Sequence, residues 1–341
     1  MIMKILKISF ILFVLLFAIL YNGCDDAGVL PKNLPKGRIT LTPLNLKPLD
    51  QNVDGWYRLW VGIDSGGSRI WYSCGEFNIS SSGTIVDLSG NSITFQFNDD
   101  TNSLAFATRA MVTIETQHNV FPSAQRLIST VLTSHFDSLS GNMDISGDLA
   151  LGTVGTKLIS GASGHYMVRT PSDSNRSCSK GLWFCDTMNV PSLPAGLTLP
   201  DSGGWVYEGW AVNHASNTYY PMGKFRNPYA ADFDGAGPCS GHNPGYTAPG
   251  QDWIADSNGC PNPPLNILSG NFGVFISLEP SNEVPGSQAD NSPFFFRIFQ
   301  QNTIDHSLGC GQSDNLFNLS ITGLFPSSLI RIQYITAHAY K

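Results

Sequence analysis

The stretch Gly55-Trp56-Tyr57-Arg58-Leu59-Trp60-Val61-Gly62-Ile63 determines the fold class that we predict for this chain. Its period of two separates the side chains into two faces, with Tyr57, Leu59, Val61 and Ile63 on one and Arg58 and Trp60 on the other. This is the period of a β-strand and not of a helix, because successive side chains of a strand point to opposite faces.

Frequent turn signals divide the rest of the chain into short runs of the same kind. Examples are Ser65-Gly66-Gly67, Ser82-Gly83, Ser89-Gly90-Asn91 and Ser202-Gly203-Gly204. Strands of about 5–8 residues that end this often build sandwiches or barrels. Only 13% of the residues are charged, while glycine (34) and proline (21) are plentiful. We therefore predict an all-β protein, with little helix beyond a short turn at Ala124–Thr133.

The first stretch has a counterpart, Trp205-Val206-Tyr207-Glu208-Gly209-Trp210-Ala211. Each is followed in the same order by G-x-F, by an apolar run that ends in glutamate, and by a turn with proline and serine. The blocks are Gly75–Phe77, Met111–Glu115 and Pro122-Ser123 in the first copy, and Gly223–Phe225, Phe275–Glu279 and Pro285–Ser287 in the second. We interpret them as a duplication, with chance similarity of short β motifs as the alternative.

The duplication predicts two tandem, related β-sandwich domains. We expect a signal peptide over residues 1–23, a tether over 24–37, a first sandwich over 38–155 and a second over 156–341. The boundary lies where glycines at 147, 152, 155, 161 and 164 resemble a flexible joint. The second copy is longer, which predicts a disulfide-stapled insertion near 232–262.

The N-terminus predicts export. Lys4 and Lys7 precede an apolar run from Ile8 to Leu20, and Gly23-Cys24 follows. A basic start, a short apolar core and a small residue before the cleavage site make an export signal. Cys24 then makes it similar to a bacterial lipoprotein signal, in which this cysteine is acylated. Plain secretion and an uncleaved anchor are the alternatives, although the run is short for a span of roughly 20 residues.

The six remaining cysteines are Cys74, Cys178, Cys185, Cys239, Cys260 and Cys310. An even number in an exported chain indicates up to three disulfides, whose pairing the sequence leaves open. Local spacing favours Cys178–Cys185 and Cys239–Cys260, which leaves Cys74–Cys310 as a long-range pair. A zinc site is the alternative, but the close C-x-x-C or H-x-x-H pairs that it needs are absent.

The second half also carries a set of short motifs: Y-x-x-x-T-P-S-D at 166–173, G-L-W-F at 181–184, G-W-V-Y-E-G-W at 204–210 and I-S-L-E-P at 276–280. On these residues it resembles bacterial and archaeal envelope proteins labelled anti-sigma-factor-like. The resemblance covers most of 160–330 and implies a β-sandwich module outside the cytoplasm. It does not imply contact with a sigma factor, because sigma factors are cytoplasmic and at most seven residues precede the apolar run.

The acidic stretch 232–256 is the strongest candidate for a ligand or calcium site. It contains Asp232, Asp234, Asp252 and Asp256, with Trp253 among them. Aspartates in a tight loop can bind Ca²⁺ through oxygen atoms, but the EF-hand pattern is incomplete. A solvated loop with Asp-capped turns is the simpler alternative.

Two other patterns are candidates for catalysis or for sugar binding. Glu115 and Glu279 end equivalent strands and could form a glycosidase pair, although their place in separate copies favours solvated or turn-holding groups. The seven tryptophans could stack on sugar rings, or could be core anchors, as the matched Trp60 and Trp210 suggest. Trp253 is the first of them to test for binding.

These patterns predict a non-enzymatic, lipid-anchored envelope protein with a binding, sensory or structural role and no cofactor. The partner would be an unknown envelope protein or a glycan, reached from a membrane to which the N-terminal lipid is attached. Nucleic acid is not an expected partner. The net charge is −7, and the sequence has no cluster of Lys and Arg residues that could bind along a phosphate backbone. The alternative is a glycan-active or glycan-binding protein that uses the loop at 232–256.

Overall fold

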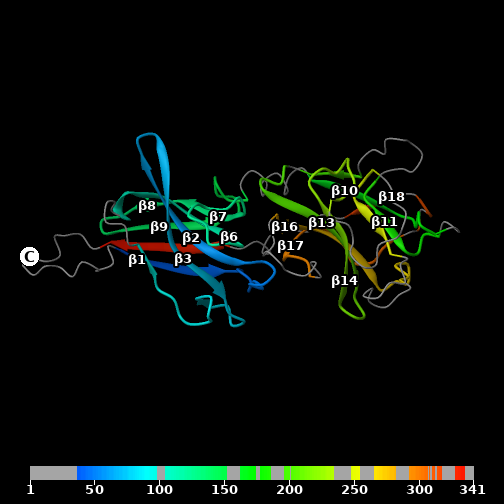
Figure 1. Ribbon diagram of the computed structural model, residues 1–341, viewed down its shortest axis with the longest axis horizontal. Helices are drawn as coiled ribbons and strands as arrows, with labels where there is room; N and C mark the ends of the chain where they lie inside the picture. The colour runs from blue at the N-terminus through cyan, green and yellow to red at the C-terminus, as the bar shows by residue number, and fades with distance from the viewer. Residues whose placement is uncertain are drawn as a thin grey trace, which may run out of the picture.

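The computed structural model of the protein has two β-rich lobes that lie side by side along its longest axis (Figure 1). It describes residues 37–97, 104–151, 162–173, 177–185, 196–199, 201–233, 247–253, 265–281, 292–305, 307, 309–311, 313–316 and 327–334. The signal peptide, Cys24 and nearly all of the tether lie outside these ranges. The prediction of an all-β fold is confirmed.

The first lobe is built on one long antiparallel sheet with the order β4-β3-β2-β6-β7-β9-β19-β1-β5, and β8 pairs with β9. Its strands are β1 (Gly37–Leu44), β2 (Trp56–Ser65), β3 (Ser68–Ile79), β4 (Ile85–Val86), β5 (Phe95–Gln96), β6 (Ala107–Glu115), β7 (Arg126–Val131), β8 (Thr133–Ser134), β9 (Ser138–Asp144) and β19 (Ser327–Tyr334). A short 3-10 helix, Leu104–Phe106, precedes β6. The expected helical turn at Ala124–Thr133 is wrong, because β7 occupies this segment.

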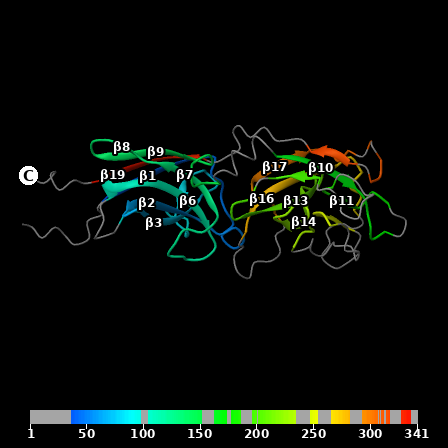
Figure 2. The ribbon, with the colours of Figure 1, turned by 90° about the horizontal axis from the view of Figure 1, so that it is seen from above.

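The sheet of the first lobe curls, so that its two ends meet around one core. Phe77 on β3 and Phe95 on β5 pack edge to face, with ring centroids 5.3 Å apart, although their strands lie near opposite ends of the sheet order. Figure 2 shows the resulting layers, with β2, β3 and β6 in one and β1, β8, β9 and β19 in the other. Alternation on β2 places Tyr57, Leu59 and Val61 in the core between them.

The second lobe consists of two smaller sheets. One has the order β12-β10-β11-β15 with β18 beside β10, and the other has the order β14-β13-β16-β17. The strands are β10 (Ser163–Val168), β11 (Gly181–Trp183), β12 (Leu197–Thr198), β13 (Trp205–Asn213), β14 (Thr218–Phe225), β15 (Gly250–Asp252), β16 (Phe272–Pro280), β17 (Phe296–Gln301) and β18 (Ser313–Leu316). Aromatic side chains join the two layers, as where Phe184 and Phe225 pack with ring centroids 6.5 Å apart.

The last strand, β19, returns to the first lobe. It lies between β1 and β9, where Ile332 is paired with Ile39 on one side and with Leu139 on the other. The sequence placed these residues in the second domain, 156–341, but the strand pairs with β1 and β9 of the first lobe. The alternation of the strand fits this position, because Ile330 and Ile332 are buried in the first lobe while Leu329 and Arg331 face outward.

The predicted repeat has the same geometry in both lobes. The strand order β3-β2-β6-β7 matches β14-β13-β16-β17. Tyr57 is opposite Phe77 in the first copy, and Tyr207 is opposite Phe225 in the second. Both copies carry a β-bulge just before the tryptophan, between Leu59 and Trp60 and between Glu208 and Trp210. A bulge inserts one residue and re-aims the side chains beyond it.

One long-range disulfide joins Cys178 to Cys310, with Cα atoms 5.6 Å apart and a sequence separation of 132. The predicted pairs Cys178–Cys185 and Cys74–Cys310 are therefore wrong. Spacing along the chain favoured the local pair, but β18 pairs with β10 and draws the 310 region towards the start of the second lobe. Cys74 is a buried free thiol and Cys185 is buried. Cys239 and Cys260 lie outside the described residues, as does most of the insertion near 232–262.

A compact polar contact joins the lobes. The Gln125 amide donates hydrogen bonds to the Gly204 carbonyl, at 2.9 Å, and to the Ser281 hydroxyl. Gly204 has a φ of +103°, and a Cβ at this position would lie 2.8 Å from the Cβ of Ala124. Glycine is thus required here both by the backbone conformation and by the close approach of the first lobe.

Candidate functional site

A buried chain of hydrogen bonds ends the repeated strand in the first lobe. The Trp60 indole N–H donates to the Thr113 hydroxyl at 2.8 Å, and that hydroxyl donates to Glu115 Oε1 at 2.5 Å. The same carboxylate oxygen accepts the Ser123 backbone N–H at 3.0 Å. Glu115 is fully buried. The predicted turn at Pro122-Ser123 is therefore held by the repeated glutamate.

The second lobe repeats this arrangement with serine in place of threonine. The Trp210 indole N–H donates to the Ser277 hydroxyl at 2.8 Å, and this hydroxyl donates to Glu279. Glu279 in turn accepts the backbone N–H of Phe294 at 2.9 Å. The two glutamates are buried in different sheets. Glu115 holds the predicted turn, whereas Glu279 holds the segment just before β17, and the turn predicted at Pro285–Ser287 lies outside the described residues. Both carboxylates are buried and hold backbone N–H groups, so they are not the solvated groups that the sequence offered as one alternative.

The acids of the 232–256 stretch do not converge in the described residues. Asp252 is buried, and its carboxylate accepts the Ser172 backbone N–H at 2.7 Å and the Ser172 hydroxyl at 2.9 Å. Asp252 thereby holds the T-P-S-D turn of residues 170–173. Asp232 lies over Gly223, where a Cβ would come 2.5 Å from its carboxylate. Asp234 and Asp256 lie outside the described residues.

The tryptophans are mainly core anchors. Trp60, Trp183, Trp205, Trp210 and Trp253 are each exposed by 2% or less, and Trp56 by 9%. Trp253, the expected stacking residue, instead donates its indole N–H to the Pro221 carbonyl at 3.2 Å and packs between the two sheets of the second lobe. Of the seven, only Trp71 is half-exposed. The interpretation of Trp253 as a ligand platform is therefore wrong.

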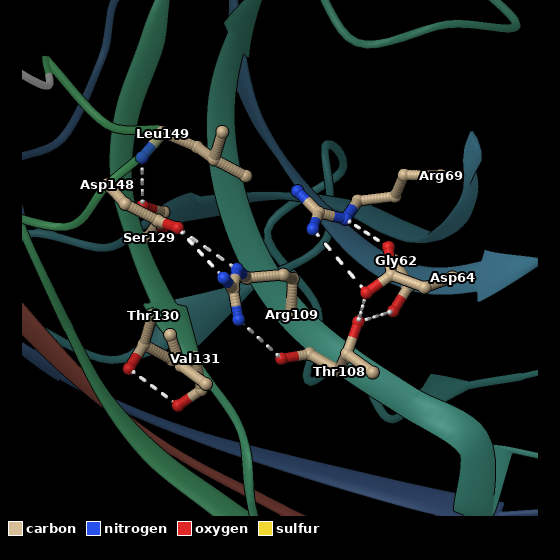
Figure 3. Close-up of polar contacts among 10 residues, drawn as sticks. All are labelled: Gly62, Asp64, Arg69, Thr108, Arg109, Ser129, Thr130, Val131, Asp148 and Leu149. Atoms are coloured by element: carbon tan, nitrogen blue, oxygen red, sulfur yellow. Dashed lines mark hydrogen bonds and ion pairs between the residues drawn. The ribbon is translucent and has the colours of Figure 1, made fainter. Parts of the chain in front are cut away.

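Trp71 belongs to a charged surface on the outer face of β2, β3 and β6. The guanidinium of Arg69 lies 5.8 Å from the centroid of the Trp71 ring. Arg69 donates to Asp64 at 2.8 Å, and Thr108 donates to the same carboxylate at 2.8 Å, as Figure 3 shows. These two bonds, that from Arg69 first, hold the pKa of Asp64 below its ordinary value.

The neighbouring cation on this surface is also paired. Arg109 contacts the Asp148 carboxylate at 3.0 Å and donates to the Thr108 carbonyl at 3.4 Å (Figure 3). Near the other end of β2, Arg58 pairs with Glu76, whose Oε1 also lies 2.9 Å from His118 Nδ1. In all these clusters the charges compensate one another, so none presents a free charge for a ligand.

A hollow on the opposite layer of the first lobe differs in this respect. It has a volume of about 500 Å³ and lies over β1, β8, β9 and β19. Its lining combines polar and apolar groups and consists of Thr40, Thr42, Thr133, Ser140, Gly141, Asn142, Leu329, Ile330 and Arg331. Arg331 has no ion pair among the residues that the structure describes, and we take this hollow as the candidate binding site.

Sequence reasoning missed this site for a topological reason. Thr40, Ser140 and Arg331 come from three segments far apart in sequence, and only the return of β19 makes them neighbours: Arg331 is opposite Thr40 on β1 and opposite Ser140 on β9. The usable signal was alternation, because the polar residues of 38–42 and 329–333 alternate with buried ones.

Within the described ranges, no group of three or more His, Cys, Asp or Glu side chains is placed to hold a metal ion. The same ranges contain no helix with the length and hydrophobicity that a membrane crossing requires. Comparisons of the chain with protein-family models, with curated proteins and with solved structures gave no match. The resemblance to anti-sigma-factor-like proteins stays a prediction.

Proposed function

We propose that this protein is an exported, lipid-anchored envelope protein that binds a ligand outside the cytoplasm without catalysing a reaction. The observation that carries the proposal is the disulfide between Cys178 and Cys310. Such long-range bridges form and persist in oxidising compartments and are rare in the reducing cytoplasm. The bridge agrees with the basic and apolar N-terminus, which predicts export with Cys24 as the lipid acceptor.

A non-enzymatic role is supported by the hydrogen bonds of the acidic residues that the sequence offered as candidates for chemistry. Glu115, Glu279 and Asp252 each use their carboxylate oxygens to hold backbone N–H or hydroxyl groups. A general acid or base needs to reach a substrate proton within hydrogen-bond distance. Buried carboxylates that are already engaged in turns are poorly placed for this, whereas a rigid β scaffold suits a binding surface.

The anchoring is tested in a bacterial host grown with a labelled fatty acid. We expect the wild-type protein to incorporate the label and to fractionate with membranes, and Cys24→Ala to lose the label. Cys74→Ala is the matched control, because it removes a buried thiol of the first lobe and leaves Cys24 in place. Label-free wild type in the medium would indicate plain secretion, and unlabelled membrane-bound protein of unprocessed mass an uncleaved anchor. Either result contradicts lipid anchoring.

Export itself is tested by the redox state of the thiols. Alkylation before and after reduction should show the Cys178–Cys310 bridge in protein taken from the envelope fraction. Fully alkylatable cysteines in a cytosolic fraction would contradict the proposal. The non-enzymatic part is tested on a panel of glycan substrates, where turnover that disappears in Asp252→Ala or Glu115→Gln variants of retained stability would refute it.

A further inference from the structure

The hollow of the first lobe lies on the outward side chains of three adjacent strands. On β1 these are Thr40 and Thr42, and on β19 they are Leu329 and Arg331. Arg38 and Gln333 are exposed on the same two strands but do not line the hollow. β9 supplies Ser140 and Asn142, and Thr133 on β8 forms the rim. The four strands lie together in one layer, the one that faces away from β2, β3 and β6 (Figure 2). The side chains stand on paired backbone, which makes the surface rigid.

The charge of this surface is positive although the whole chain carries −7. Arg331 is opposite Thr40, and Arg38 is opposite Gln333, so the two arginines are diagonal neighbours on adjacent strands. Diagonal side chains lie roughly 7–8 Å apart, within reach of a common ligand. Neither arginine has an ion pair among the described residues, and no acid lines the hollow. Asp144, at the end of β9, accepts the Ser146 N–H and hydroxyl at 2.9 and 2.6 Å.

The rest of the lining combines hydroxyl and amide groups with a larger apolar surface, to which Leu329 and Ile330 belong. Thr40, Thr42 and Thr133 carry hydroxyls that both donate and accept. The Ser140 hydroxyl lies 2.8 Å from His135 Nε2, which orients it from the rim. Leu329 is 51% exposed beside these groups and offers an apolar surface. The volume of about 500 Å³ lies in the usual range for small-ligand sites.

We infer that this hollow binds an acidic oligosaccharide, with a sugar carboxylate on Arg331 and sugar hydroxyls on the surrounding threonine, serine and asparagine groups. A guanidinium binds carboxylate with two parallel hydrogen bonds. Hydroxyls spaced by adjacent strands match the repeated hydroxyls of a sugar chain, and Leu329 meets the apolar face of a ring. The inference rests on the binding role proposed above and names the class of its ligand.

The test measures binding to the purified full-length protein by calorimetry, with hexagalacturonate as the probe. Maltohexaose is the neutral probe of the same length, and inorganic phosphate is the anion without a sugar. Binding in solution does not depend on lipidation or export, so its failure is distinguishable from a failure of the anchoring experiments. A hexagalacturonate complex in a protein that proves to be cytosolic would retain this inference and refute the anchoring.

We expect hexagalacturonate to bind at least tenfold more tightly than maltohexaose and to weaken as salt is added. Arg331→Gln should weaken binding about tenfold or more, because it removes the charge-assisted hydrogen bonds from the guanidinium to the sugar carboxylate. Thr40→Val should weaken it by a smaller factor. The matched control is Arg126→Gln on β7, which removes another exposed arginine of the same sheet outside the hollow.

Three outcomes would overturn the inference. Equal affinity for the acidic and neutral oligosaccharides would show that Arg331 does not recognise a sugar carboxylate. Phosphate binding as tight as hexagalacturonate would reduce the hollow to a simple anion site. Wild-type affinity in Arg331→Gln, with an unchanged thermal unfolding midpoint, would place the ligand elsewhere. Because Arg331 faces outward, its substitution leaves the core intact and the variant interpretable.

Discussion

Glu115 and Glu279 occupy the same position in two different sheets, and each accepts a hydrogen bond from a hydroxyl two residues earlier on its own strand. That hydroxyl in turn accepts the indole N–H of the repeated tryptophan. A buried carboxylate is costly unless its oxygens are satisfied, so each glutamate can persist only with its turn in place. The relationship explains why the repeated block ends in glutamate, because its carboxylate holds backbone that follows the strand.

We predict that Glu115→Ala destabilises the first lobe by about 2–4 kcal/mol, because it leaves the Thr113 hydroxyl and the Ser123 N–H without their charged acceptor. Urea unfolding measures the change. Asp137→Ala is the control, since Asp137 is exposed between β8 and β9 and should shift stability by less than about 0.5 kcal/mol. Equal, small effects of both substitutions would show that the buried network contributes little.

Ile332→Ala, near the C-terminus, is predicted to destabilise the N-terminal lobe. Ile332 is fully buried between β1 and β9, and removing such a side chain costs about 2–5 kcal/mol. Hydrogen exchange should show lost protection in β1 and β9 while β13 and β16 are less affected. Leu329→Ala, at a 51% exposed position of the same strand, is the control for stability. Lost protection confined to the second lobe would contradict the position of β19.

The disulfide gives a third prediction. Cys310→Ala should lower the free energy of unfolding by about 2–5 kcal/mol, since a bridge over 132 residues restricts the unfolded chain. Mass spectrometry of a non-reducing digest should find the peptides of Cys178 and Cys310 linked, and should find this link intact in Cys74→Ala. A linked peptide that contains Cys178 and Cys185 would support the local pairing instead.

Alkaline pH is predicted to destabilise the first lobe. Burial raises the pKa of the Cys74 thiol to about 12, and burial also raises the pKa of the Tyr57 hydroxyl. The folded state then holds protons that the unfolded state releases above about pH 8.5, the ordinary thiol value. The stability that the Cys74 thiol contributes is complete below that pH and is lost as pH rises towards 12.

Each such group contributes at most about 1.4 kcal/mol per pH unit. Urea unfolding at pH 8, 9 and 10 should therefore show falling stability, with a shallower fall in Cys74→Ala. Tyr229→Phe, at a 66% exposed tyrosine, should keep the wild-type slope. A stability that rises with pH over this window would contradict the burial of the thiol.

The contact between the lobes is tested by two glycines that share a positive φ. Gly204→Ala should destabilise the protein by about 2–4 kcal/mol, because the added Cβ meets Ala124 at 2.8 Å in addition to the left-handed strain. Gly66→Ala is the matched control, with a φ of +59° and no atom within 4 Å of the added Cβ. It should cost only about 1–2 kcal/mol. Equal costs would show that the lobes do not press together at Gly204.

Much of the fold could be predicted from local sequence patterns. The alternation around Tyr57 predicted strands, and the repeated order of blocks agrees with the matching strand neighbours that the structure has in the two lobes. Such features depend on side-chain period and on turn residues, which are properties of a few consecutive positions. The hydroxyls at Thr113 and Ser277 were present in the repeated blocks as well, but only their burial shows that they connect the tryptophans to the glutamates.

The sequence by itself determined the all-β class and the repeated order of blocks, and it suggested a core role for the matched Trp60 and Trp210, since hydrophobic alternation and repetition can be read without knowing which strands pair. Only the tertiary structure decided that β19 closes the first lobe, that Cys178 is bonded to Cys310, and that Arg331 lies beside Thr40 and Ser140. These features depend on contacts between segments far apart in the chain. Strand pairing is set by the whole sheet, because an apolar face such as that of Ile330 and Ile332 specifies burial but not a particular partner.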